Sequence, residues 1–266
     1  MSSSDATLSS ASVQLSSGRR IPLLGFGTWQ LKGPSAAQSV EWALDAGYRL
    51  VDTATMYRNE RQVGDGLVRS GIDRDRIFVT TKIPPDRSGS ELETLRESLT
   101  ALSIDHVDLW LIHWPLDEGG IALDIWKAMV GVRDQGLATD IGVSNYSLDQ
   151  LDQLAAATGV RPAVNQIEWS PLLFDRATVD GHQERGIVLE GYSALKNTDL
   201  DDPVLRGIAD AHGVSAAQVL LRWHLDHGFV AIPKSVTPER IEANFAVTGF
   251  SLTHDEVARI DGLAGS

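Results

Sequence analysis

No cysteine occurs among the 266 residues of the chain, which excludes disulfide bridges, thiolate metal sites and cysteine nucleophiles together. Lysine is also scarce, and its only positions are Lys32, Lys82, Lys127, Lys196 and Lys234. No apolar run is long enough to span a membrane. Residues 1–12 lack the basic and apolar regions of a secretory signal, so we expect a disordered tail there.

Positive charge is in the minority. The chain has 23 Lys+Arg against 36 Asp+Glu, which gives a formal net charge of −13. Nucleic acid and anionic membrane surfaces would repel such a chain. We therefore expect no nucleic-acid or membrane partner, and a soluble cytoplasmic monomer that acts on a small molecule.

The motifs of several other enzyme classes are missing as well. The sequence contains no His-Glu-x-x-His, no phosphate loop of the Gly-Lys-Ser/Thr type and no Gly-x-Ser-x-Gly elbow. His224 and His227 could pair on a metal, but no third ligand lies nearby in the sequence. We interpret this pair as a solvated helix face and predict no metal site.

Strand-like and helix-like segments alternate about eight times, which is typical of a parallel sheet with crossover helices. Strands are expected near 24–28, 48–52, 77–82, 107–112, 139–143, 163–167, 187–192 and 229–232. Helices are expected near 35–46, 60–70, 90–101, 121–135, 148–157, 176–184, 203–226, 238–246 and 253–263. A hairpin of residues 13–24 precedes them. Barrels of about 250 residues commonly form one domain, so residues 13–266 are predicted to be a single domain.

Ionisable residues end three consecutive strands of this pattern. Asp52 ends the second expected strand, Lys82 the third and His113 the fourth, while Tyr57 lies in the loop after Asp52. Each residue alone has an ordinary explanation, such as a strand cap or a core histidine. Active sites of parallel α/β barrels are assembled at these strand ends, so the four together predict a catalytic site.

Tyr57 is the candidate general acid of this site. An unperturbed tyrosine has a pKa near 10 and gives up its proton at neutral pH only beside a cation. Lys82 is the cation that the neighbouring strand end supplies. The sequence therefore predicts a tyrosine–lysine pair.

Seven short motifs follow one another in the order that is typical of the aldo-keto reductase family. They occupy residues 47–60, 81–82, 112–115, 142–145, 165–166, 191–193 and 232–240. The chain thus resembles that family over nearly all of residues 13–263, and is similar to its bacterial diketogluconate-reductase-like members. The resemblance implies a (β/α)8 TIM barrel with an N-terminal β-hairpin and a C-terminal helix.

The resemblance also implies the reaction, which is reduction of aldehydes and ketones with NADPH. In the family's pattern Tyr57 donates the proton, Lys82 stabilises the tyrosinate, Asp52 holds Lys82, and His113 orients the carbonyl oxygen. Relatives that reduce carbon–carbon double bonds carry glutamate at the His113 position, so histidine indicates carbonyl reduction.

Residues 234–240 open an expected helix, where backbone N–H groups with Lys234 and Arg240 would suit a doubly charged phosphate. A well-capped helix, with Thr237 before a proline, is the alternative explanation. The resemblance makes this segment the 2′-phosphate site of NADPH. The cofactor residues that it implies are Gly27, Thr28, Ser144, Asn145, Gln166, Tyr192, Ser193, Leu195, Lys234, Ser235, Val236, Thr237, Arg240 and Asn244. Ala243 departs from the family's acidic or amide residue.

The walls of the substrate pocket are expected to be the aromatic side chains of Trp29, Trp114 and Trp169. The loop of residues 114–120 is short, and the chain lacks a C-terminal extension that covers the pocket in many relatives. We therefore expect an open pocket and a broad range of small carbonyl substrates. Two alternatives are an NADPH-binding redox sensor without turnover and a barrel hydrolase or isomerase that uses Asp52 and His113.

Overall fold

A computed structural model of the protein describes residues 11–264. An eight-stranded parallel sheet has the order β10-β9-β8-β7-β6-β5-β4-β3. A parallel bridge between Leu24 and Ala231 joins its two edges, so the sheet closes into the predicted (β/α)8 barrel. The strands are β3 (Phe26–Gly27), β4 (Leu50–Asp52), β5 (Phe78–Ile83), β6 (Val107–Ile112), β7 (Ala138–Ser144), β8 (Val164–Glu168), β9 (Val188–Tyr192) and β10 (Val230–Ala231).

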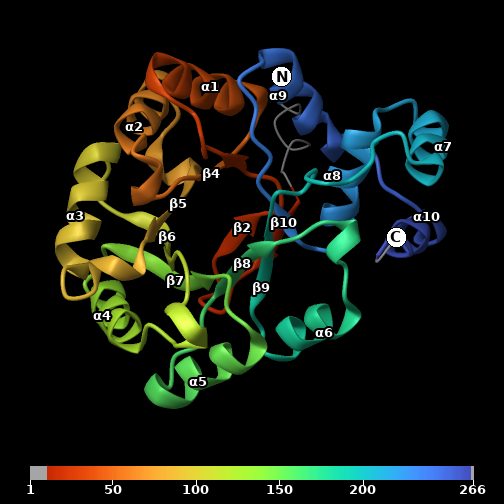
Figure 1. The fold of residues 1–266 in the computed structure, drawn as a ribbon. Helices are drawn as coiled ribbons and strands as arrows, with labels where there is room; N and C mark the ends of the chain where they lie inside the picture. Colours follow the sequence, from red (N-terminus) through yellow and green to blue (C-terminus); the bar gives the residue numbers. More distant parts are fainter. Residues whose placement is uncertain (1–10, 265–266) are drawn as a thin grey trace.

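Helices surround this sheet (Figure 1). They are α1 (Gly33–Ala46), α2 (Glu60–Arg69), α3 (Glu91–Leu102), α4 (Leu123–Asp134), α5 (Leu148–Thr158), α6 (Arg176–Glu184), α7 (Pro203–His212), α8 (Ala216–Asp226), α9 (Pro238–Phe245) and α10 (His254–Asp261). The single helix predicted over 203–226 was wrong. Gly213 ends α7 with a φ of +65°, and Ser215 begins α8 with a capping box to Gln218, so the sequence carries a stop and a start there.

The predicted N-terminal hairpin is β1 (Ser12–Gln14) paired antiparallel with β2 (Arg20–Pro22). It begins one residue earlier than expected, and residues 1–10 of the predicted tail lie outside the described residues. Arg19 at its turn donates to Asp108 at 2.6 Å, and Ser17 donates to Asp140 at 2.9 Å. Because these aspartates lie in the N-terminal halves of β6 and β7, the hairpin covers that end of the barrel.

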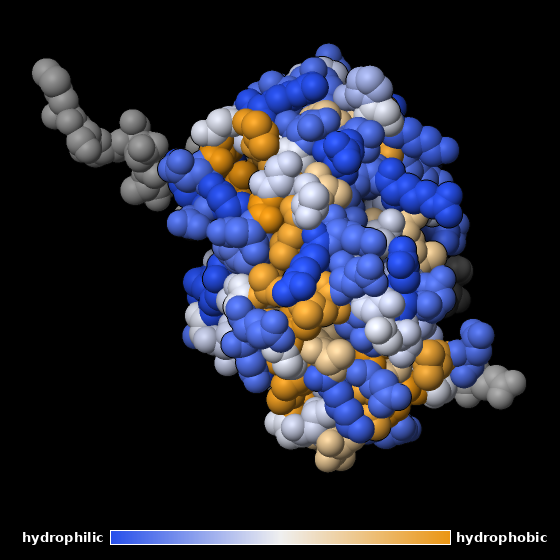
Figure 2. Space-filling view, turned by 90° about the vertical axis from the view of Figure 1, so that its left-hand side faces the viewer, coloured by the Kyte–Doolittle hydropathy of each residue, from blue (hydrophilic) through white to orange (hydrophobic). Residues whose placement is uncertain are grey.

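Hydrophobic burial explains why the strands hold the site rigidly. Every residue of β4, β5 and β6 is buried, as expected for parallel strands that helices cover on one side and a filled barrel on the other. A second cluster, which includes Trp169, Trp223 and Phe229, packs β9 against α7, α8 and α10. The outer face in Figure 2 is mostly hydrophilic, with hydrophobic side chains visible between the charged ones. Among residues 11–264, none of the helices has the length and apolarity needed to cross a membrane.

Candidate active site

A cavity of about 660 Å³ opens at the C-terminal ends of the barrel strands. Its walls are Gly27, Trp29, Gln30, Asp52, Met56, Tyr57, His113, Trp114, Ser144, Asn145, Gln166, Glu168, Tyr192, Ser193, Ala194, Leu195, Lys196, Ile232, Pro233 and Lys234. The strand ends thus bring together the predicted acid, the predicted histidine and many of the predicted cofactor residues.

Below the cavity lies a buried ion pair between Asp52 and Lys82. Lys82 Nζ lies 2.6 and 2.7 Å from the two carboxylate oxygens of Asp52, and it also donates to the Thr53 carbonyl at 3.0 Å. Gln166 donates from Nε2 to Asp52 Oδ2 at 2.9 Å. The lysine side chain is fully buried, so its charge is held at one point by these partners rather than by water.

Tyr57 reaches this pair from a short 3-10 helix, η1 (Thr55–Tyr57). Its hydroxyl lies 3.4 Å from Lys82 Nζ. Thr55 ties η1 to β5 by donating to the Lys82 carbonyl at 2.8 Å, and Arg58 ends it in the left-handed region with a φ of +57°. The loop after β4 therefore places the tyrosine directly over the neighbouring strand end.

Burial and charge oppose each other at these two groups. Burial raises the pKa of Tyr57 above its usual value, while the adjacent Lys82 ammonium lowers it. For Lys82, burial lowers the pKa, but the Asp52 carboxylate and Tyr57 overcome it and raise the pKa above its usual value. Lys82 thus stays charged, as predicted. The pKa of Tyr57 remains above its usual value, so without ligands the phenol is a weaker acid than free tyrosine.

His113 follows the end of β6, and its ring lies edge-on to that of Tyr57 with centroids 5.6 Å apart. Burial, and then the Lys82 ammonium, lower the pKa of His113 to about 3, so the imidazole is neutral. Its Nδ1 is buried without a hydrogen-bond partner among the described residues. An unpaired lone pair costs less than an unpaired N–H, so this position favours a proton on Nε2. The ring can then donate from Nε2.

A connected group of polar side chains forms the wall at the ends of β7 to β9. Asn145 donates from Nδ2 to Ser144 Oγ at 3.0 Å and to the His113 carbonyl at 3.2 Å. Tyr192 donates to Asn145 Oδ1 at 2.8 Å, which fixes its ring. The side chain of Asn145 is therefore fixed by Ser144, His113 and Tyr192, while that of Gln166 is held by Asp52.

Gly27 and Thr28 differ in their relation to the cavity. A Cβ at position 27 would lie 2.6 Å from the Ile232 carbonyl oxygen, so only glycine fits between β3 and the segment after β10. Thr28 is fully buried and does not line the cavity, and its Oγ1 donates to the Asp52 carbonyl at 2.9 Å. We infer that Thr28 supports the strand end rather than contacting a ligand.

The predicted phosphate segment leads from the cavity to the start of α9. Lys234 lines the cavity, and Thr237 stands at the N-cap of α9 without a side-chain cap hydrogen bond. The alternative of a helix that begins at Thr237 and a proline is confirmed in position, but the Thr237 side chain satisfies none of the first N–H groups. Asn244 is half-buried on α9 and the preceding Ala243 is exposed.

The three predicted tryptophans do not all reach the cavity. Trp29 and Trp114 line it, with 57% and 44% of their surface exposed. Trp169 does not line it, because its ring turns away into the cluster with Phe174 and Phe229. A tryptophan just after a strand end can point to the mouth or to the helix layer, and the sequence does not distinguish the two.

The interpretation of His224 and His227 as a solvated face was also wrong. His224 is fully buried, with its two ring nitrogens near the carbonyls of Leu220 and Trp169 at 2.8 and 3.3 Å. His227 Nε2 lies 2.8 Å from Asp261 on α10. These histidines join α8 to its neighbours, and no group of potential metal ligands is found within the described part of the chain.

Several wall residues were not predicted from the sequence. Glu168 ends β8 and forms an ion pair with Lys196 at 2.9 Å across the mouth, and Met56 lies exposed beside Tyr57. Glu168 meets the strand-end criterion that identified Lys82, so that criterion could have found it. Lys196 and Met56 lie in loops without such a signal.

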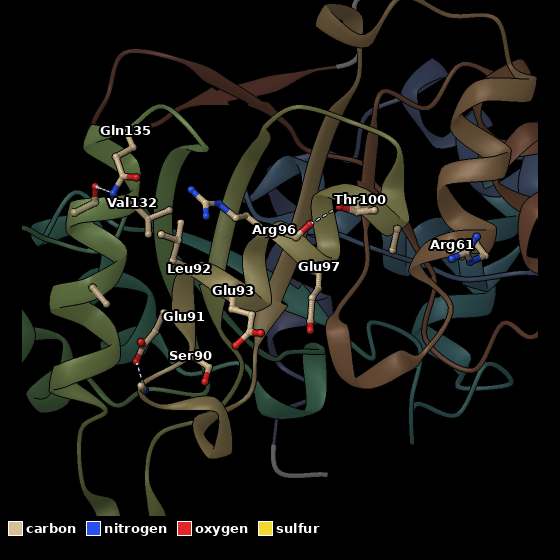
Figure 3. A pocket seen from close by; sticks show the side chains of 14 residues that line it. Arg61, Ser90, Glu91, Leu92, Glu93, Arg96, Glu97, Thr100, Val132 and Gln135 are labelled. Carbon is tan, nitrogen blue, oxygen red and sulfur yellow. Dashed lines mark hydrogen bonds between the residues drawn. The ribbon is translucent and has the colours of Figure 1, made fainter.

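A second hollow, of about 940 Å³, lies on the outer surface between α3 and α4 (Figure 3). Its charged side chains, among them Arg96 and Glu93, belong to solvated helix faces. The hydrogen bonds drawn there are local, such as Thr100 Oγ1 to the Arg96 carbonyl. None of the strand-end residues borders it, so we place the chemistry in the smaller cavity.

Comparison with known proteins gives one consistent result. The sequence model of the aldo/keto reductase family matches residues 23–264. Morphine 6-dehydrogenase of Pseudomonas putida is 43% identical over 267 residues, covering 94% of this chain and 90% of that protein. Methylglyoxal reductase DkgA of Salmonella typhimurium is 40% identical over 251 residues, covering 93% and 91%.

Solved structures agree. An aldo/keto reductase from Brucella melitensis has a TM-score of 0.92 at 40% identity, covering 96% of this chain and 98% of that one. A Bombyx mori aldo-keto reductase in complex with NADP has a TM-score of 0.91 at 34% identity, covering 96% and 93%. The chain belongs to the aldo/keto reductase family and is an oxidoreductase, which confirms the family, fold class and enzyme class predicted from its motifs.

Proposed function

We propose that this oxidoreductase reduces small aldehydes and ketones to alcohols with NADPH, and that Tyr57 donates the proton. The observation that carries the proposal is the 3.4 Å approach of Lys82 Nζ to the Tyr57 hydroxyl, with Asp52 holding the lysine from below. A phenol and a neutral imidazole at one cavity wall, with a fixed cation below the phenol, are groups that carbonyl reduction can use.

The family and the NADP in the Bombyx mori relative support NADP(H) as the cofactor. When bound, the nicotinamide supplies the hydride. The preassembled amides of Asn145 and Gln166, with Ser144, suit its carboxamide. Lys234 and Arg240, at a helix start without a side-chain cap, suit the 2′-phosphate. The other proposed contacts are Gly27, Tyr192, Ser193, Leu195, Ser235, Val236, Thr237 and Asn244.

Each catalytic side chain has a separate task in this proposal. His113 donates from Nε2 to the carbonyl oxygen and orients it. Tyr57 then gives its proton to the same oxygen as negative charge develops there. The Lys82 ammonium stabilises the tyrosinate that remains, which offsets the burial that raises the pKa of Tyr57.

The shape of the cavity supports a broad range of small carbonyl substrates. Trp29 and Trp114 give it aromatic walls, and both remain substantially exposed. The loop after Trp114 turns back at once, with the Leu116 N–H bonded to the Gly120 carbonyl at 3.0 Å. An open mouth leaves few buried polar groups that could reject a wrong substrate. Methylglyoxal reductase among the relatives is consistent with a small dicarbonyl substrate.

The test is NADPH oxidation with a panel of aromatic aldehydes, short α-keto compounds and sugars, with the alcohol product identified. We expect turnover of many of them with high Michaelis constants. NADPH binding without any turnover would favour the redox-sensor alternative, and selectivity of several orders of magnitude for one compound would contradict the open cavity. We also propose that the enzyme acts in the cytoplasm as a monomer, which gel filtration and fractionation would check.

A further inference from the structure

A further ionisable residue lies inside the barrel beside the Asp52–Lys82 pair. Glu190 belongs to β9, and its register partners are Gln166 on β8 and Val230 on β10. Its side chain is fully buried, and neither carboxylate oxygen has a hydrogen-bond partner among the described residues. A charged carboxylate in such a place is expensive, so Glu190 requires an explanation.

The sheet register places Glu190 next to the Asp52–Lys82 pair, because its register partner Gln166 donates to Asp52 Oδ2 at 2.9 Å. Asp52 from β4 and Lys82 from β5 neutralise each other, and Tyr57 from η1 is the remaining titratable group that interacts with it. Burial and then the Asp52 carboxylate raise the pKa of Glu190, whereas Lys82 and the Gln166 amide lower it. The net result is a pKa of about 8. The Gln166 amide lies close enough to lower the pKa of Glu190, but it does not form a hydrogen bond with either carboxylate oxygen.

Ionisation of Glu190 would raise the pKa of Tyr57. With a neutral Glu190, the Lys82 ammonium faces only the Asp52 carboxylate in addition to Tyr57. With an ionised one, the same lysine faces two carboxylates, and the second negative charge raises the pKa of Tyr57. A tyrosinate then forms less readily.

We propose that Glu190 is a positioning residue for proton transfer, a buried carboxyl group whose ionisation state sets how strongly Lys82 acts on Tyr57. The inference rests on the proposed carbonyl reduction and deepens it. Glu190 touches neither cofactor nor substrate, since it does not line the cavity. Its effect should be strongest in alcohol oxidation, where Tyr57 must first lose its proton.

The experiment compares the wild type with Glu190→Gln, which keeps the shape and removes the titration. Alcohol oxidation with NADP+ is followed from pH 6 to pH 10. We expect the two proteins to agree within about twofold at pH 6, and the variant to be about tenfold faster at pH 9, the effect of one pKa unit at Tyr57. Michaelis constants should not change.

The matched control is Glu184→Gln, an exposed carboxylate at the end of α6, which should reproduce the wild-type profile at every pH. A second readout is tyrosinate absorbance during alkaline titration. Burial also raises the pKa of Tyr48, Tyr146 and Tyr192, so Tyr57→Phe in the same titration identifies the part of the absorbance change that belongs to Tyr57. That part should begin at lower pH in Glu190→Gln.

Coincident profiles of wild type and Glu190→Gln would overturn the inference while leaving the proposed reaction intact. A wild type that neither reduces carbonyls nor oxidises alcohols would instead overturn the proposed reaction. If the variant does not fold, infrared difference spectra of the wild type can follow the ionisation of Glu190 instead. A neutral carboxyl band that disappears as the pH rises through about 8 supports the inference, and its absence at pH 6 contradicts it.

Discussion

Buried carboxyl groups are paired to different extents along the barrel. At the N-terminal end, Asp108 is nearly fully buried, and its two oxygens accept from Arg19, Arg74 and the Val79 N–H. At the C-terminal end Asp52 is paired with Lys82, whereas His113 Nδ1 and, in the middle of β9, both Glu190 oxygens have no partner among the described residues. Paired polar groups stabilise a fold, whereas unpaired ones cost stability and remain where chemistry uses them.

Surface exposure shows the same contrast. The hairpin turn covers the N-terminal end and contributes Ser17 and Arg19 to its polar contacts. The C-terminal end instead leaves Trp29, Met56 and Trp114 exposed around a cavity. The N-terminal end is thus closed by polar contacts with the hairpin. The C-terminal end is open, and the exposed side chains around its cavity could pack against a ligand.

The largest effect should come from Lys82→Met, which removes the cation under Tyr57. We expect turnover to fall by about 10²–10⁴-fold. The unfolding free energy should also fall, by about 3–5 kcal/mol, because Asp52 is left buried without its partner. Steady-state NADPH oxidation and denaturant unfolding measure the two effects, with exposed Lys127→Met as control. Turnover within tenfold of wild type would remove Lys82 from the mechanism.

Arg240→Ala tests the phosphate site at the start of α9. A charge-assisted contact with the 2′-phosphate contributes about 1.5–3 kcal/mol, so the dissociation constant for NADPH should rise by about 10–150-fold. NADH binding should stay unchanged, because NADH has no 2′-phosphate. Fluorescence titration checks both, with exposed Arg259→Ala on α10 as control. Equal losses for NADPH and NADH would show that Arg240 contacts something else.

Asp108→Asn tests the N-terminal end directly. Loss of its charge-assisted hydrogen bonds should lower the unfolding free energy by about 1–3 kcal/mol and leave turnover unchanged. The exposed Asp210→Asn, on α7, should change neither quantity. A drop in turnover without a drop in stability would break the contrast between the two ends.

A gradual effect, about 1 kcal/mol within any one pH unit, concerns the pH dependence of stability. The folded-state pKa of His113 is lowered to about 3 by burial and Lys82, so its contribution is present above pH 6.5 and lost as the pH falls towards 3. In His113→Gln, the unfolding free energy should therefore fall less steeply below pH 6.5, by about 1 kcal/mol per pH unit. Exposed His254→Gln should keep the wild-type slope.

The fold and the meeting of the four proposed catalytic residues at one edge of the sheet were predictable because both follow from the alternation of strands and helices. Once Asp52, Lys82 and His113 are assigned to strand ends, parallel pairing requires them to meet at one edge. The break between α7 and α8 was missed although Gly213 and Ser215 signal it, because the apolar periodicity continues across them. Element boundaries depend on such local caps rather than on periodicity.

Side-chain direction was the part that the sequence could not determine. Trp169 and Trp114 both follow strand ends, yet one packs into the helix layer and the other lines the cavity. Glu190 was overlooked because the sequence does not show which side chains lie next to it in the barrel. It lies in the middle of an apolar strand, where a charged residue is unusual, but only the closed barrel shows that it faces the Asp52–Lys82 pair.

The proposed proton transfer is tested most directly by a single-turnover reaction of Tyr57→Phe. The variant and the wild type are saturated with NADPH, mixed with an aromatic aldehyde and followed by nicotinamide absorbance. NADPH affinity should agree within about twofold, because the hydroxyl is needed only for the proton, while the reduction rate should fall by about 10²–10⁴-fold. A rate within tenfold of wild type would contradict Tyr57 as the proton donor.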